Sequence, residues 1–119
     1  NAVKHFKFER VEGGKRRIHQ SPNRTEIVAC RPWLAAELDF LEPEVLVCLG
    51  ATAGKAVFGP SFKVTAQRGV PMTSTELNGP GGLVVVATIH PSAVLRSRDR
   101  DEMYAGLVSD LRVAAEALV

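Results

Sequence analysis

The chain has 119 residues, of which 45% are hydrophobic and 24% charged, a balance that suits one globular domain with a buried core. No apolar run reaches the roughly 20 residues of a membrane span and no cleavable signal is evident, so we expect a cytoplasmic protein without a membrane partner. The two cysteines do not indicate a disulfide-stapled secreted protein.

The positive charge is concentrated at the start of the chain. Residues 1–24 carry seven Lys or Arg against two Glu, giving +5, whereas the remainder carries eight against eleven, giving −3. This asymmetry indicates a local polyanion-binding face, and a solvated charged loop explains the charge equally well.

The first segments read as a strand, a loop and a helix. The pattern predicts a strand over residues 1–5 that runs directly into a long, irregular, basic loop over residues 6–23, and such loops are usually functional or mobile. A helix should follow over residues 24–41, with Asn23 as its N-cap and with Pro32 causing a kink or a weakened turn. The expected apolar stripe of this helix consists of Ile27, Trp33 or Leu34, Leu38 and Leu41.

Two short apolar runs, at residues 44–50 and 83–88, predict buried parallel strands. A short helix should occupy residues 51–58, and loops with an irregular strand should fill residues 61–82. A last helix is predicted over residues 101–118. Its expected inward-facing residues are Met103, Leu107, Leu111, Ala114 and Leu118.

Strands that alternate with helices predict an α/β fold with a largely parallel sheet, in which ligands bind beyond the carboxyl ends of the strands. Three polar segments fall at such ends: residues 1–5 with the loop that follows them, residues 50–52, and residues 90–92. We therefore expect these segments to form one site.

The segment Gly50–Lys55 follows a strand and opens a helix, so its backbone N–H groups and the Thr52 hydroxyl are suited to bind a phosphate. The spacing of a P-loop is absent. An ordinary turn capped by Thr52 is the better interpretation of this segment when it is considered alone.

His90 leaves the end of a predicted strand and is fixed by Pro91, an arrangement that suits hydrogen bonding to a ligand. Ser92 could hold a phosphate. Leu95 and Arg96, expected on an exposed loop, could enter a DNA groove, since base flipping requires a wedge side chain. A histidine whose hydrogen bonds are satisfied at the strand end is the competing interpretation, and spacing alone slightly favours it.

The basic loop contains the run Lys15-Arg16-Arg17-Ile18-His19-Gln20. Adjacent cations disfavour a charged His19 imidazole, which leaves a ring nitrogen lone pair available for nucleophilic attack. A basic patch that only contacts phosphates is the alternative.

Cys30 and His5 are candidate metal or cluster ligands, but two residues cannot complete a four-ligand site. The missing ligands would have to precede Asn1. Cys48 lies in an apolar run and is expected to be a buried small hydrophobe.

Four ordered segments resemble the motifs of family 4-type uracil-DNA glycosylases, and the resemblance covers nearly the whole chain. These segments are Asn1-Ala2-Val3-Lys4, then Asn23-Arg24-Thr25-Glu26-Ile27 with Ala29-Cys30-Arg31-Pro32-Trp33-Leu34, then Leu49-Gly50-Ala51-Thr52-Ala53, and finally His90-Pro91-Ser92-Ala93-Val94-Leu95-Arg96. The run from Lys15 to Gln20 is similar to the distinctive loop of the UdgX branch of that superfamily.

The resemblance implies a three-layer α/β/α domain with a mostly parallel central sheet. It implies that Asn1 reads the Watson–Crick edge of a flipped uracil and that His90 stabilises charge on the uracil carbonyl. It also implies a [4Fe–4S] cluster held in part by Cys30 and His5, although family 4 members usually have cysteine where His5 stands. Two further ligands are expected in an amino-terminal part that this sequence lacks, so residues 1–119 are interpreted as the carboxy-terminal part of one domain.

In the UdgX branch the loop histidine, here His19, is expected to capture C1′ of the deoxyribose, so that the enzyme stays attached to DNA after a single turnover. Arg17 and Gln20 would position the loop at the substrate. The remaining DNA-binding candidates are Lys15, Arg16, Thr52, Leu95 and Arg96.

Two other functions compete with covalent capture: a multi-turnover glycosylase that releases uracil, and a non-catalytic nucleic-acid-binding module. The expected partners are uracil-containing DNA, slightly favoured as a single strand, and free uracil. The complete protein is expected to be a monomer and, if bacterial, associated with the nucleoid.

Overall fold

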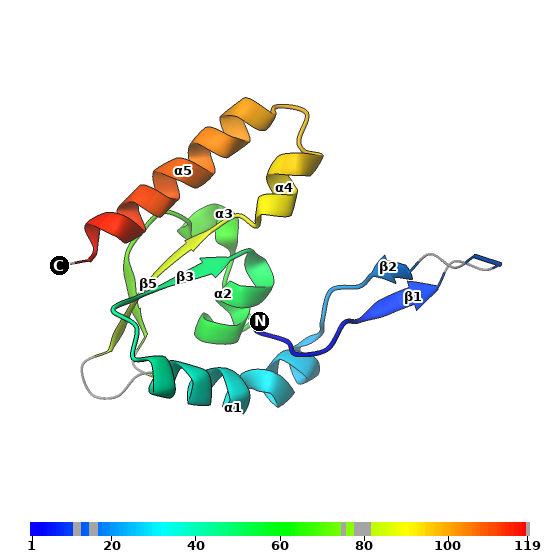
Figure 1. The fold of residues 1–119 in the computed structure, drawn as a ribbon, viewed down its shortest axis with the longest axis horizontal. Coiled ribbons are helices and arrows are strands. Elements are labelled where there is room, and N and C mark those ends of the chain that lie inside the picture. Colours follow the sequence, from blue (N-terminus) through cyan, green and yellow to red (C-terminus); the bar gives the residue numbers. More distant parts are fainter. Residues whose placement is uncertain (11–12, 15–16, 75, 78–81, 119) are drawn as a thin grey trace.

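The computed structural model of the chain describes residues 1–10, 13–14, 17–74, 76–77 and 82–118 (Figure 1). Its elements in chain order are β1 (Phe8–Arg10), β2 (Arg17–His19), α1 (Arg24–Leu41), β3 (Val45–Leu49), α2 (Ala51–Phe58), α3 (Val64–Gln67), β4 (Met72–Ser74), β5 (Leu83–Thr88), α4 (Pro91–Arg96) and α5 (Arg100–Glu116). The helices predicted over residues 24–41 and 51–58 and the strand predicted over residues 83–88 have the predicted bounds.

The central sheet has the strand order β3-β5-β4. β3 and β5 pair in parallel, as predicted, but β4 runs antiparallel to β5, so the sheet is mixed rather than mostly parallel. The cause is the connection before β4. The Gly69 N–H donates to the Ala87 carbonyl at 2.9 Å, so the chain leaves α3 beside the carboxyl end of β5. The few residues that remain before Met72 are too short for the crossover that a parallel strand requires.

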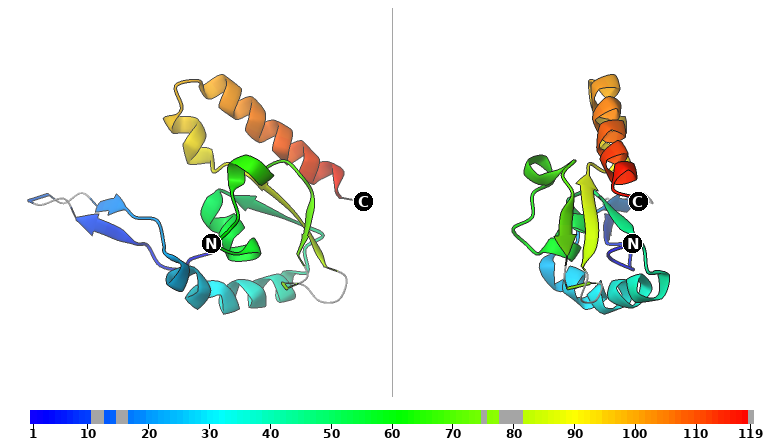
Figure 2. Two further views of the ribbon diagram at one scale, coloured as in Figure 1. Left: turned by 180° about the vertical axis from the view of Figure 1, so that it is seen from behind. Right: turned by 90° about the vertical axis from the view of Figure 1, so that its left-hand side faces the viewer.

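Helices cover both faces of this sheet (Figures 1 and 2). Leu83, Val85 and Ala87 alternate along β5 and pack in a buried cluster with residues of α1 and α2. On the other face the Thr88 hydroxyl donates to the Asp110 carboxylate of α5 at 2.6 Å. The α/β class and the predicted three-layer architecture are therefore confirmed.

α1 begins with a capping box. The Asn23 side chain accepts from the Glu26 N–H at 3.0 Å, and the Glu26 carboxylate accepts from the Asn23 N–H at 3.2 Å, which confirms Asn23 as the N-cap. The helix continues through Pro32. Ile27, Cys30 and Leu38 are buried, whereas Trp33 and Leu41 of the predicted stripe are each 67% exposed. Leu34, not Trp33, continues the buried face, because it lies one turn from Cys30 and from Leu38.

α5 also differs in part from its predicted inward face. Leu107 and Ala114 are buried, but Leu111 and Leu118 are 41% and 54% exposed. Asp110 takes a buried position beside Leu107, and its carboxylate pairs with the Arg68 guanidinium at 2.8 Å. Apolar periodicity could not indicate a buried carboxylate. Within the described ranges, no helix is both long and apolar enough to cross a membrane.

The predicted irregular loop over residues 6–23 contains a β-hairpin that projects from the body of the molecule (Figure 1). β1 and β2 pair antiparallel, with Phe8 opposite His19 and Arg10 opposite Arg17. The strand expected over residues 1–5 is absent from the structure, where residues 3–5 form a bend and have no strand partner in the described chain.

Candidate active site

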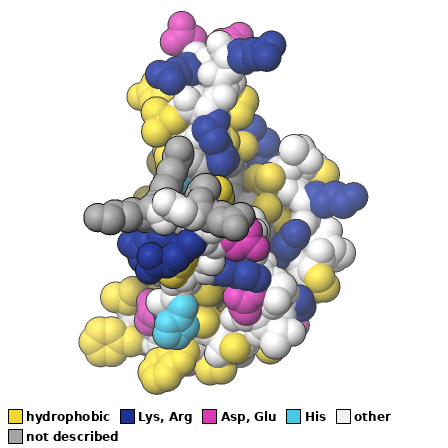
Figure 3. Space-filling view, turned by 90° about the vertical axis from the view of Figure 1, so that its right-hand side faces the viewer, with side chains coloured by type: hydrophobic (Ala, Val, Ile, Leu, Met, Phe, Trp, Pro, Cys, Tyr) yellow, Lys and Arg dark blue, Asp and Glu magenta, His cyan; other side chains and the backbone are white. Residues whose placement is uncertain are grey.

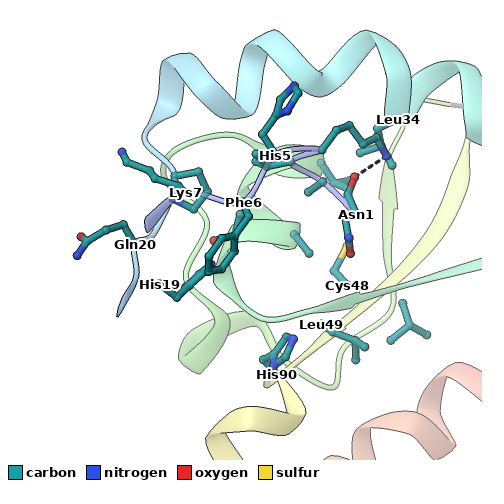
Figure 4. A pocket seen from close by; sticks show the side chains of 18 of the residues that line it. Asn1, His5, Phe6, Lys7, His19, Gln20, Leu34, Cys48, Leu49 and His90 are labelled. Carbon is teal, nitrogen blue, oxygen red and sulfur yellow. Dashed lines mark hydrogen bonds between the residues drawn. The ribbon is translucent and has the colours of Figure 1, made fainter. Parts of the chain in front are cut away.

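An open cavity of about 690 Å³ lies between the start of the chain, the base of the hairpin and the carboxyl end of β3 (Figure 4). Its apolar wall includes Leu46 and Leu49 of β3. Several residues that we predicted to be functional line it, namely Asn1, His5, His19, Gln20, Thr52 and His90. The three segments expected at strand ends therefore meet at one cavity.

Other predicted residues lie away from the cavity wall. Lys15 and Arg16 fall outside the described residues, so their predicted phosphate contacts have no position in the structure. Leu95 and Arg96, predicted on an exposed loop, lie instead in the last turn of α4, where Leu95 is 65% exposed. A helix forms there because Pro91 occupies its first turn, where the missing N–H costs nothing. The remaining residues outside the wall are Arg17, Ser92 and Cys30.

His90 has a defined hydrogen-bonding state. Its Nδ1 accepts the backbone N–H of Ser92 at 3.1 Å and lies 2.9 Å from the Ser92 hydroxyl oxygen. Because a backbone N–H can only donate, Nδ1 must be the acceptor, and neutral His90 then carries its proton on Nε2. His90 can thus donate through Nε2 to a ligand. The Ser92 hydroxyl and N–H contact the His90 imidazole, and the phosphate contact of Ser92 stays a prediction.

Gly50 brings the start of α2 against His90. Its φ of +93° lies in the region that favours glycine, and a Cβ at this position would sit 3.2 Å from the His90 Cβ. The Gly50 N–H donates to the Thr88 carbonyl at 2.9 Å. Thr52 was considered as the cap of α2, but the N-cap residue is Gly50 and Thr52 lines the cavity instead.

His19 lies at the end of β2, near the body of the molecule (Figure 4). The adjacent Gln20 N–H donates to the Lys7 carbonyl at 2.9 Å, which extends the hairpin pairing towards the cavity. The His19 ring lies 5.5 Å from the Phe6 ring, centroid to centroid, and is tilted by 34°. Phe6 also lines the cavity, although we did not predict it as a site residue. The alternation of Phe6 and Phe8 in the sequence was the pattern that could have indicated it.

Lys4 ties the first residue to α1. Its ammonium group donates to the Asn1 carbonyl and to the Glu37 carboxylate, both at 2.5 Å. The hydrogen bond from Lys4 lowers the pKa of Glu37. Lys4 belongs to the Asn1-Ala2-Val3-Lys4 segment, but its role in holding Asn1 was not anticipated.

The backbone of Lys4 also brings the segment that contains His5 to Cys30. The Lys4 N–H donates to the buried Cys30 sulfur at 3.4 Å, and His5 is the next residue along. A thiol that accepts a backbone N–H fits one corner of a cluster site. In the part of the chain that the structure describes, no group of three or more His, Cys, Asp or Glu side chains gathers to hold a metal ion. The described residues therefore offer part of a ligand set only.

Cys48 is 2% exposed, and burial raises the pKa of its thiol to about 11. A neutral thiol in that setting is unreactive. Cys48 is a small apolar core residue, as predicted.

Known proteins match this chain over most of its length. Residues 1–112 match the family model described as the Uracil DNA glycosylase superfamily. The chain is 36% identical over 84 residues to the type-4 uracil-DNA glycosylase of Thermotoga maritima, a match that covers 70% of this chain and 41% of that protein. It thus spans less than half the length of this relative. The chain belongs to the uracil-DNA glycosylase superfamily.

Proposed function

We propose that the complete protein removes uracil from DNA and that His19 then bonds to the sugar, leaving the protein attached after one turnover. The observation that carries this proposal is that His19 of the hairpin and His90 at the end of β5 line the same cavity. A proton donor and a nucleophile at one cavity suit the two sides of a single glycosidic bond.

In the first step the bond between uracil N1 and C1′ breaks, leaving its electron pair on uracil and positive charge on the sugar. His90 stabilises the uracil anion through Nε2–H, because Nδ1 is engaged by Ser92. The Asn1 amide offers one donor and one acceptor group, which match the O4 acceptor and the N3–H donor of uracil.

In the second step a ring nitrogen of His19 donates its lone pair to C1′ and forms the new bond, and the imidazole then loses its ring proton. A nucleophile held in place competes with water through proximity. The Phe6 ring beside His19 supports this role, since it restricts the orientation of the imidazole. Arg17 and Gln20 position this end of the hairpin at the substrate.

DNA would be held along the basic start of the chain and at α4. Figure 3 shows several Lys and Arg side chains spread over the face from which the hairpin projects, with a few Asp and Glu side chains among them. Residues 1–24 carry a net charge of +5, which favours contact with phosphates. Leu95, 65% exposed on α4, is available as a wedge beside Arg96, and Thr52 is available at the cavity wall. We infer a slight preference for single-stranded DNA.

The pair formed by Cys30 and His5 is consistent with two ligands of a [4Fe–4S] cluster. When bound, the cluster would supply a structural link between the start of the chain and α1. The N–H of Lys4 would stabilise the Cys30 thiolate through the contact at 3.4 Å.

We also propose that residues 1–119 form the carboxy-terminal part of one domain, which is monomeric when complete. The match to 41% of the length of the Thermotoga maritima protein is consistent with a chain that forms part of a longer domain. So is β3, which within the described residues pairs on one side only. A further strand on the open side of β3 would narrow the cavity.

Intact and peptide mass spectrometry tests covalent capture. The complete protein is mixed with a uracil-containing oligonucleotide, denatured in hot detergent and digested. We expect an adduct on the peptide that contains His19, and none with thymine in place of uracil. The adduct should be lost in His19→Ala and kept in the matched control Ile18→Ala. Ile18 is exposed on the neighbouring position of β2 and lies outside the cavity wall.

Two other outcomes would favour the competing functions. Free uracil without an adduct would identify a multi-turnover glycosylase, and His19 would then only position the hairpin. Neither uracil nor an adduct, from protein with an intact cluster, would leave a nucleic-acid-binding module.

A further inference from the structure

One face of the hairpin carries a continuous row of aromatic and cationic side chains. Phe8 and Arg10 lie on one face of β1, opposite His19 and Arg17 of β2. Phe6 lies two residues before Phe8, just outside β1, and its ring stacks on the Phe8 ring. Alternate residues of a strand share a face, and cross-strand partners lie side by side on it. We call these five residues the hairpin stacking face.

The rings and the guanidinium group within this face are already in stacking geometry. Phe6 and Phe8 are nearly parallel, with ring centroids 5.4 Å apart and planes inclined by 19°. The Arg17 guanidinium lies 5.3 Å from the Phe6 centroid and 5.0 Å from the Phe8 centroid. Arg10 lies 6.0 Å from the Phe8 centroid. Planar groups are thus presented together with positive charge.

The Phe6 and Phe8 rings are not packed in the hydrophobic core. Phe6 is 54% exposed and Phe8 is 37% exposed, and neither belongs to either buried cluster of the described chain. The hairpin projects from the body, so no described helix covers this face (Figures 1 and 2). Exposed aromatic rings that interleave with arginine are suited to stack on nucleobases and to bind the adjoining phosphates.

We propose that the hairpin stacking face binds an unpaired nucleobase of single-stranded DNA, next to the nucleotide that occupies the cavity. The base stacks on Phe8, while Arg17 and Arg10 contact the backbone. The position of the base rests on the proposed function, because His19 stands at the cavity end of the same face. Duplex bases are stacked on one another and cannot present a free ring face, so this surface selects single strands.

Stacking predicts little preference among bases, because every base has a π face. One stacked base contributes about a 5- to 150-fold gain in affinity. The effect should disappear when the DNA lacks a base but keeps its phosphates.

Fluorescence anisotropy tests the proposal with two single strands of equal length. One contains only thymine bases, and the other contains tetrahydrofuran abasic sites. Neither contains uracil, so the measurement is independent of glycosidic bond cleavage and of the His19 adduct. In the complete protein, Phe8→Ala should weaken thymine-strand binding about 5- to 150-fold and leave abasic-strand binding nearly unchanged. Phe8→Tyr should retain most of the affinity.

Phe40→Ala is the matched control, because Phe40 is an exposed phenylalanine at the far end of α1, at 87% exposure. It should bind both strands as the parent protein does. An equal loss on the two strands for Phe8→Ala, or no loss on either, would overturn the proposal.

A second variant reports on stacking without removing the ring. Phe8→Trp in a Trp33→Phe background moves the tryptophan of residues 1–119 onto the hairpin, since Trp33 is the one tryptophan in this range. The thymine strand should quench its fluorescence and the abasic strand should not; equal quenching, or none, contradicts the proposal. Quenching by the thymine strand, with neither uracil release nor an adduct on uracil-containing DNA, would refute the proposed function and leave stacking established. Uracil release or an adduct without quenching would support the proposed function and refute stacking.

Discussion

The two histidines at the cavity are held in different ways. His90 follows a strand whose residues are almost fully buried, its Nδ1 is fixed by the Ser92 N–H, and Gly50 packs against its Cβ. His19 lies on a projecting hairpin whose described β-strand residues are all exposed, and its ring contacts the exposed Phe6. The core therefore fixes His90, which we propose for bond cleavage. The exposed hairpin carries His19, which we propose to bond to the sugar after cleavage. Substitutions on the hairpin should change whether the protein stays bonded to the sugar, without abolishing cleavage of the glycosidic bond.

The largest effect is expected for His19→Ala. Without the imidazole at the end of β2 the proposed nucleophile is removed, so the DNA adduct should disappear. Water should then quench the sugar cation, and free uracil should still form. Denaturing electrophoresis measures the adduct, and chromatography measures released uracil. Loss of both products in a folded variant would show that His19 is needed for cleavage, which would contradict the separation of roles.

A second large effect is expected for His90→Asn in single-turnover uracil release. Asparagine can still cap α4, so the fold should persist, but its shorter amide does not reproduce the Nε2–H donor. The rate should fall by roughly 10²- to 10³-fold, as for other losses of a donor to a developing anion. Ser92→Ala should cost less than about tenfold, because it removes one neutral hydrogen bond and keeps the Ser92 N–H. A larger loss for Ser92→Ala than for His90→Asn would argue against the assigned donor.

The same contrast between the core and the hairpin explains which elements the sequence could predict. α1, α2 and β5 have strong local signals: a capping box, a glycine at each end of α2, and a continuous apolar run. The hairpin has none of these. Its strands are held by contacts such as Arg17 over Phe8, which do not form an apolar pattern. The direction of β4 depended on where α3 ends, which is a tertiary property.

The candidate site was predictable at the level of its residues and not of its contacts. Strand ends indicated that Thr52 and His90 would meet, because the parallel strands β3 and β5 present their carboxyl ends together. Asn1 lines the same cavity although the strand expected around it does not form. The Ser92 N–H contact with His90 required the helical turn of α4. That helix has six residues, too few for a helical period to be recognised.

The core and the hairpin should also differ in how much they contribute to the free energy of unfolding. Asp110→Ala removes the carboxylate that holds both Arg68 and the Thr88 hydroxyl beneath the end of β5. Leaving these groups without their acceptor should cost about 2–3 kcal/mol in the free energy of unfolding of the complete protein. Lys7→Met breaks the ion pair with Glu26 at the base of the hairpin and should leave unfolding unchanged within error, because exposed ion pairs contribute little. Urea denaturation measures the free energy of unfolding of both variants. Equal losses would mean that the hairpin contact contributes as much to stability as the buried carboxylate.

The smallest effect concerns the base of the hairpin, where the ammonium group of Lys7 donates to the Glu26 carboxylate at 2.6 Å. That hydrogen bond, followed by the one from the Asn23 N–H, lowers the pKa of Glu26 below its ordinary value of 4.5. A carboxyl whose pKa is lower in the folded state stabilises the fold above its unfolded pKa, and the contribution is lost as the pH falls through the folded value. Attachment of the hairpin to α1 should therefore weaken only below pH 4.5. The carboxyl carbon shift of Glu26, followed by NMR against pH, should show an inflection below 4.5 that moves up in Lys7→Met. An unchanged inflection in that variant would mean that the capping box, and not the hairpin, sets the charge state of Glu26.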